Sequence, residues 1–274
     1  MFGNVQFGEV DHWVLVVYPD AGEAGGSWQV PRKRRKRTEK PSSEHEEEPE
    51  DPWEELQRPT EGMAEPLGAW QSRSALEAAR RARAQVRRYC ASNRLNRLGT
   101  LTYAGEGCRD MVVVREHIGE FFRVLRDSLG GDAFPYLWTT EWHKTHGLHV
   151  HFAVGQYIPR RLISETWGHG FVHIKLLGDL PVGTGKLGEA RRAAGYLSKY
   201  VGKNIDDARR IQGLHRYDVA QGFAPRKERF HGRQWSDVVD QAVERMGAGP
   251  VRMWRSDDEP GWDGPPAGWL QWAG

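Results

Sequence analysis

The sequence is poor in cysteine and has no long apolar run. Its 274 residues include two cysteines, Cys90 and Cys108, which show neither paired metal-ligand spacing nor a disulfide framework. No stretch approaches the roughly 18 apolar residues of a membrane span, and the N-terminus lacks the pattern of a secretory signal. We therefore expect a soluble, cytoplasmic, bacterial-type protein with no membrane partner.

A nucleotide-binding loop is also missing. The stretch "PVGTGKLG" (181–188) resembles a phosphate-binding loop, but the pattern GxxxxGK[ST] would need Gly at Leu180 and Ser or Thr at Leu187. A flexible loop before a helix is the better interpretation. No ATP-binding module is expected.

Charge is nearly balanced in total, at +2, but unevenly placed. A basic block at 31–40 is followed directly by an acidic block at 44–55, and such blocks usually remain solvated. We therefore expect residues 1–68 to be a mostly disordered N-terminal region. Within it, the apolar run "HWVLVVY" (12–18) indicates an isolated strand or a docking segment.

The expected folded domain covers residues 69–240, and a Trp/Gly/Pro-rich tail covers 241–274. The tail tryptophans either dock a partner or fold back on the domain. They are Trp254, Trp262, Trp269 and Trp272.

Hydrophobic periodicity within the domain predicts alternating helices and strands. Helices are expected at 75–94, 111–131, 161–167 and 188–204, and strands at 97–103, 135–143, 148–158 and 170–177. The two central strands are separated by a short turn and not by a helical crossover, so they are antiparallel. The prediction is an α+β fold with a central antiparallel β-sheet flanked by helices.

Arginine is concentrated on the first of these helices, which suits a polyanion such as nucleic acid, although a solvated helix face fits equally. The candidate DNA-binding residues there are Arg80, Arg81, Arg87, Arg88 and Arg94.

Histidine is crowded into "TTEWHKTHGLHVHF" (139–152), with four histidines within nine positions. Alternate strand residues share a face, so His149 points with His151, and Glu141 points with His143. A three-residue loop, 145–147, would pair His143 with His149 and Glu141 with His151, with glycine at the left-handed turn position. Cross-strand Cβ atoms lie about 4.5–5.5 Å apart, close enough to share a cation.

Two imidazoles and a carboxylate form the three-ligand set of a catalytic metal. We therefore predict His149 and His151 as ligands, with Glu141 as the third and His143 as its runner-up. A solvent-facing strand that carries histidine only by composition is the alternative.

The helix "GYLSKYVGKN" (195–204) carries Tyr196, Lys199, Tyr200 and Lys203 on one flank. Lysine beside tyrosine favours phenolate and can hold a phosphate. The alternative is an amphipathic helix with tyrosine hydroxyls at the core boundary. With a metal nearby, one tyrosine can attack a phosphodiester to give a covalent phosphotyrosine.

Three motifs together resemble the HUH endonuclease superfamily, specifically its two-tyrosine rolling-circle replication initiators. The motifs are the strand "LGTLTY", the hairpin "EWHKTHGLHVH" and the helix "YLSKYVGK", in that family's order. The stretch "WGHGFVHI" also resembles a strand of that group, and the likeness covers about residues 95–204.

The resemblance implies an RRM/ferredoxin-like sheet, Mg²⁺ or Mn²⁺ at the histidines, and nicking and rejoining of single-stranded DNA at a replication origin. It makes Tyr196 and Tyr200 the nucleophiles, with Lys199 at the phosphate and Lys203 at the DNA. No helicase domain is fused, so a host helicase is the expected partner. A two-tyrosine transposase, a non-catalytic DNA-binding regulator and a metallo-hydrolase that ignores the tyrosines are the competing interpretations.

Overall fold

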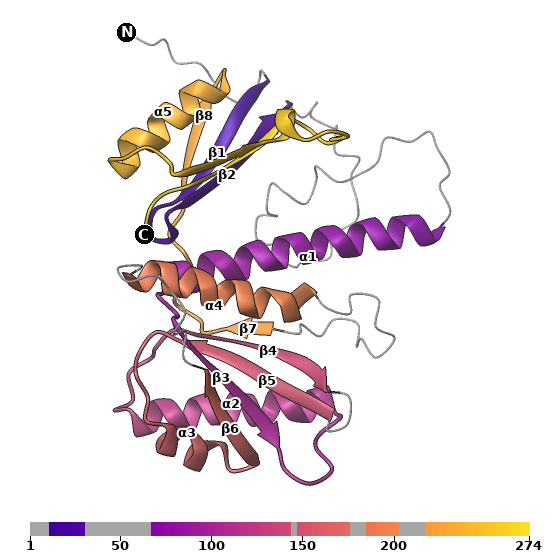
Figure 1. Cartoon of the computed structure of the whole chain (residues 1–274), viewed down its shortest axis with the longest axis vertical. Coiled ribbons are helices and arrows are strands. Elements are labelled where there is room, and N and C mark those ends of the chain that lie inside the picture. Colours follow the sequence, from indigo (N-terminus) through magenta and orange to yellow (C-terminus); the bar gives the residue numbers. More distant parts are fainter. Residues whose placement is uncertain (1–10, 31–66, 144–146, 176–184, 203–216) are drawn as a thin grey trace, which may run out of the picture.

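The protein consists of two antiparallel sheets separated by a layer of helices (Figure 1). The computed structural model describes residues 11–30, 67–143, 147–175, 185–202 and 217–274. The first sheet, here called the histidine sheet, has the order β6-β3-β5-β4-β7. Its strands are β3 (Arg97–Tyr103), β4 (Tyr136–His143), β5 (Gly147–Val154), β6 (Gly170–Lys175) and β7 (Tyr217–Val219).

Helices cover both faces of the histidine sheet. One face packs against α2 (Met111–Ser128) and α3 (Arg160–Trp167), in a core that includes Phe121, Phe152 and Trp167. The other packs against α1 (Leu67–Ser92) and α4 (Gly185–Gly202), where Val86 and Leu197 are fully buried. The predicted α+β class, with a central antiparallel sheet flanked by helices, is confirmed.

A second sheet joins segments from the two ends of the chain. This terminal sheet has the order β8-β1-β2-β10-β9, and α5 (Trp235–Met246) packs against it through a core with Trp13 and Leu270. Its strands are β1 (His12–Tyr18), β2 (Glu23–Gln29), β8 (Glu228–Gly232), β9 (Arg252–Arg255) and β10 (Ala267–Gln271).

The terminal sheet changes the expected domain boundaries. The run 12–18 is not an isolated strand, because it pairs with β2 and with β8. Residues 241–274 are not a simple tail, because β9 and β10 are paired within them and Trp272 is buried, so the tail tryptophans fold back at this point. The charged blocks at 31–40 and 44–55 lie outside the described residues.

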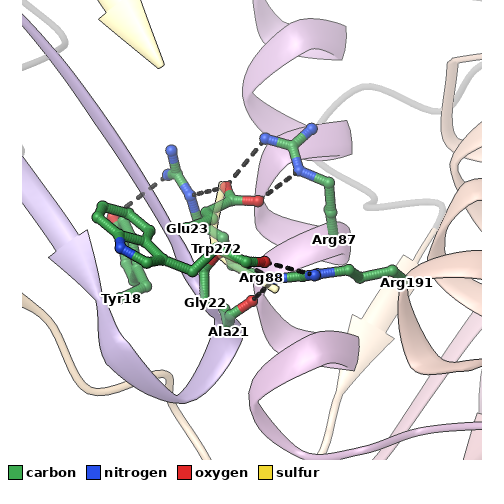
Figure 2. A network of polar contacts seen from close by, with 8 residues as sticks. All are labelled: Tyr18, Ala21, Gly22, Glu23, Arg87, Arg88, Arg191 and Trp272. Carbon is green, nitrogen blue, oxygen red and sulfur yellow. Dashed lines mark hydrogen bonds and ion pairs between the residues drawn. The ribbon is translucent and has the colours of Figure 1, made fainter. Parts of the chain in front are cut away.

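A buried carboxylate joins the terminal sheet to the helix layer (Figure 2). Glu23 on β2 accepts hydrogen bonds from Arg87 at 2.7 and 3.0 Å and from Arg88 at 2.8 Å, both on α1. Burial alone would raise the pKa of Glu23, but the two guanidinium groups hold it below its ordinary value. Arg88 also lies over the ring of Tyr18, 4.3 Å from its centroid.

The tyrosine helix α4 is tied to the same junction. Arg191 donates hydrogen bonds of 2.9 Å to the carbonyl oxygens of Ala21, Gly22 and Trp272 (Figure 2). These three acceptors belong to the terminal sheet and its turns, so the packing of that sheet helps to fix α4 over the histidine sheet.

Both cysteines are free thiols, and Cys90 is fully buried between α1 and α4, which raises its pKa. Among the helices in the described ranges, none is long and apolar enough to cross a membrane.

Candidate nuclease site

The histidine hairpin is built from β4 and β5, and its register differs from the predicted one by two residues. Glu141 pairs with His149, Thr139 pairs with His151, and His143 pairs with Gly147. The connecting residues are therefore 144–146, which lie outside the described residues, and not 145–147. The expected cross-strand partners were wrong, but a shift of two preserves which side chains share a face.

Gly147 explains where the hairpin closes. Its φ is +75°, and a Cβ atom there would meet the carbonyl oxygen of Cys108 at 2.2 Å. The next residue, Leu148, donates its backbone N–H to that same oxygen at 2.7 Å. Gly147 is thus the first residue of β5, in contact with the segment before α2, and not the last loop residue.

The site face of the histidine sheet carries the predicted ligands in neighbouring rows. One row runs across four strands through Phe171, Thr102, His149 and Glu141. The next row runs through His173, Thr100, His151, Thr139 and Tyr217. The opposite face carries Leu148, Val150 and Phe152, which are buried in the core, so the expected division of polar and apolar faces is confirmed.

His151 is the centre of the site, and it is almost fully buried. Its Nε2 lies 3.0 Å from Oε2 of Glu141, and its Nδ1 lies 3.0 Å from Oγ1 of Thr100. Its ring stacks on that of Tyr200, with centroids 4.1 Å apart and planes 15° apart. Three different elements therefore fix the imidazole in both position and orientation.

The donor set fits a divalent cation at this point in one respect. Two ligands in cis positions around an octahedral ion, with bonds of about 2.1 Å, lie about 3 Å apart, which is the separation of the His151 and Glu141 donor atoms. His149 follows on the same face, and its ring stacks on that of His143 at 4.6 Å. Among the described residues, no group of three or more His, Cys, Asp and Glu side chains meets the criteria for a metal site.

The two tyrosines lie over the histidine strand but in unequal surroundings. Their rings are 5.3 Å apart, and Tyr196 meets the His151 ring edge-on at 6.0 Å. Burial raises the pKa of Tyr200, and a hydrogen bond with Tyr196 and the nearby Glu141 charge add to the shift. Tyr196 instead has the ammonium group of Lys175 4.4 Å from its ring centroid.

The lysines differ from the prediction in one respect. Lys199 is exposed on α4, and Lys203 lies outside the described residues. The lysine in contact with a tyrosine is Lys175, from β6, which sequence reasoning did not single out. Its signal was present, because Phe171, His173 and Lys175 alternate along one strand and so share the site face.

The candidate DNA-binding arginines divide into two groups. Arg80 and Arg81 are exposed on α1. Arg87 and Arg88 bind Glu23, and Arg94 donates to the carbonyl oxygens of Asp20 and Ala91. The second group therefore joins the two halves of the protein, a role that the sequence did not reveal because Glu23 is distant along the chain.

Thr100 is the other residue that sequence reasoning missed. It belongs to the strand motif "LGTLTY", and its hydroxyl contacts Nδ1 of His151. Its period-two position on the site face is visible in the sequence, but its pairing with His151 depends on the long-range register of β3 with β5.

Fold and site together define an α+β domain in which a histidine hairpin faces a helix bearing two tyrosines. A family model of replication-associated proteins of the ORF2 type matches residues 96–205, which contain both features. The match confirms the resemblance to rolling-circle replication initiators at the level of this family and indicates a role in DNA replication. Comparison with curated proteins and with solved structures gave no significant match.

Proposed function

We propose that the protein initiates rolling-circle replication by nicking and rejoining single-stranded DNA at an origin, through a covalent 5′-phosphotyrosine. The observation that carries the proposal is the contact of the His151 ring with Tyr200 and with the carboxylate of Glu141. It brings a nucleophile and a metal-binding donor pair to one point. The family match over residues 96–205 supports the biological setting.

In the proposed reaction, a tyrosine oxygen attacks the scissile phosphorus. A tyrosine–phosphate bond replaces the bond to the 3′-oxygen, and the phenolic proton is balanced by the proton that the departing 3′-oxygen gains. Because one phosphodiester replaces another, the bond energy is kept for later rejoining. The second tyrosine can accept the next cut end while the first still holds its strand.

We assign the metal to Glu141, His149 and His151, with His143 as the alternative to Glu141. Mg²⁺ or Mn²⁺ bound there would polarise the phosphate oxygens. The hydroxyl of Thr100 would fix the orientation of His151, as residues behind metal ligands commonly do. Lys175 is placed to stabilise negative charge at Tyr196 and the phosphate. Unwinding of the duplex is assigned to a host helicase.

The test is to incubate the protein with single-stranded DNA and Mn²⁺ and to look for a slow-migrating protein–DNA adduct under denaturing conditions. We expect an adduct from the unaltered protein and none from the double variant Tyr196→Phe, Tyr200→Phe. Cleavage without an adduct, unchanged in the double variant, would indicate a metallo-hydrolase. DNA binding without any cleavage would indicate a regulator.

A further inference from the structure

The site face of the histidine sheet is only half covered by helices. At one end of the strands, Leu98, Leu137 and Ala153 are buried beneath α1 and α4. At the other end, Thr102 and Glu141 are partly exposed and His143 is exposed. This uncovered part of the face, here called the open half, begins directly beside the histidines.

Phe171 stands at the edge of the open half. It is 70% exposed, while its neighbours Val172 and Ile174 point to the opposite face and belong to the core or pack against it. β6 is an edge strand of the sheet, and an edge strand usually carries charged or polar side chains on a face exposed to water. A large aromatic ring at this position gains nothing from burial within the protein.

The register connects Phe171 to the site. Phe171 pairs with Thr102, Thr102 pairs with His149, and His149 pairs with Glu141, so the four side chains form a single row across the sheet. Two strand spacings separate Phe171 from His149, a distance of about 10 Å. A nucleotide next to a phosphate held at the histidines can reach that ring.

Charge along β6 fits the same occupant. Phe171 shares its face with His173 and Lys175, both exposed, and Lys175 also contacts Tyr196. Aromatic rings alternating with basic groups bind single-stranded nucleic acid, because bases stack on the rings while cations meet the phosphates. Sheets that expose aromatic side chains bind unpaired bases in the same way.

We infer that Phe171 is a base-stacking residue that holds the nucleotide beside the scissile phosphate. The inference deepens the proposed nicking function and rests on it for the position of that phosphate. The open half is then the track for single-stranded DNA, running across the strands from Glu141 to the β6 edge. Phe171 contacts the base and Lys175 contacts the backbone close to Tyr196.

The first experiment measures binding without cleavage. Fluorescence anisotropy with a labelled oligothymidine of about 12 nucleotides, in the absence of divalent metal, compares the unaltered protein with Phe171→Ala and Phe171→Trp. We expect Phe171→Ala to bind about 5- to 100-fold more weakly and Phe171→Trp to bind as well as the unaltered protein. Tyr157→Ala is the matched control, since Tyr157 is 74% exposed beyond the end of β5.

The second experiment locates the base. One abasic site is moved along the oligonucleotide, and Phe171→Ala is combined with each position in the adduct assay. At one position next to the cut, the abasic site and the variant should be non-additive. Because Phe171 is exposed, the thermal unfolding of Phe171→Ala should match that of the unaltered protein.

The outcomes separate this inference from the proposed function. If the unaltered protein forms the adduct but Phe171→Ala binds and reacts equally well, Phe171 is not a stacking residue and the nicking function stands. If Phe171→Ala weakens binding while no adduct ever forms, the DNA track is supported and the nicking function fails. Equal weakening by Tyr157→Ala overturns the assignment of Phe171.

Discussion

The imidazole of His151 stacks on the phenol ring of Tyr200 at a centroid distance of 4.1 Å. His151 belongs to a central strand of the histidine sheet, and Tyr200 belongs to a helix that begins more than thirty residues later. The contact joins two motifs that the sequence could only suggest were neighbours. It places a phenol beside the donor atoms of His151 and Glu141, which is the arrangement that phosphodiester cleavage by tyrosine requires.

The two tyrosines should contribute unequally to the first cut. Burial and the hydrogen bond with Tyr196 keep Tyr200 as a neutral phenol, whereas Lys175 lies against Tyr196 and favours negative charge there. We expect Tyr196→Phe to slow first-strand cleavage about tenfold more than Tyr200→Phe does. Single-turnover cleavage of labelled DNA measures this difference, and equal rates for the two variants would contradict the assignment.

Thr100→Val should weaken metal binding. The hydroxyl of Thr100 contacts Nδ1 of His151, and loss of such a contact commonly lowers metal affinity about 10- to 100-fold. Titration with Mn²⁺, followed by calorimetry, measures the change. Thr139→Val is the matched control, because Thr139 pairs with His151 from the other side and its buried hydroxyl has no hydrogen-bond partner among the described residues. A similar loss in both variants would refute a specific role for Thr100.

Glu23→Gln should destabilise the fold by about 2 kcal/mol, because it weakens a buried carboxylate's contacts with two arginines. Chemical denaturation measures the loss. Glu228→Gln is the control, since its pair with Arg245 lies at the surface and should matter little. A loss in Glu228→Gln as large as that in Glu23→Gln would argue against the junction.

The same pair of proteins predicts a pH dependence. The pKa of Glu23 is lowered in the folded state from an ordinary value of 4.5. Its contribution to stability is therefore complete above pH 4.5 and is lost as the pH falls through the lower, folded-state pKa. The difference in unfolding free energy between the unaltered protein and Glu23→Gln should shrink on acidification below that value. A difference that grows in acid would show that another group dominates.

Gly147→Ala should disturb the hairpin. Alanine would need the left-handed φ of +75° and would press its Cβ against the Cys108 carbonyl, so we expect a loss of at least about 2 kcal/mol. Gly105→Ala has a similar φ of +60° but open space around it, and should lose only about 1 kcal/mol. Thermal unfolding of the two variants compares them. Equal losses would mean that the contact with Cys108 is unimportant.

Local pattern was sufficient for much of the histidine sheet. The strand predicted at 97–103 matches β3, and the helix and strand periods elsewhere place α2, α3, α4, β4 and β5 within a few residues of their observed bounds. The shared face of Glu141, His149 and His151 also follows from a period of two, which a shift of two residues does not alter. The exact cross-strand partners do not follow, because the contact of Gly147 with Cys108 sets the register.

The terminal sheet could not be predicted in this way. Its strand β2 reads "EAGGSWQ", with two glycines and no continuous apolar face, and its partner β10 lies more than 230 residues away. Pairing at that separation leaves no local signal. Glu23 likewise gives no local reason to be buried, so the arginines that bind it resembled a DNA-binding surface in the sequence.

The most direct test of the central claim is to identify the residue that becomes linked to DNA. Trypsin cleaves after Arg192, Lys199 and Lys203, so Tyr196 falls on the peptide 193–199 and Tyr200 on the peptide 200–203. Mass spectrometry of the digested adduct, formed with Mn²⁺, should find the nucleotide on 193–199 after the first cut, and His149→Ala with His151→Ala should remove it. A nucleotide on any other peptide, or an adduct indifferent to both histidines, would contradict the account.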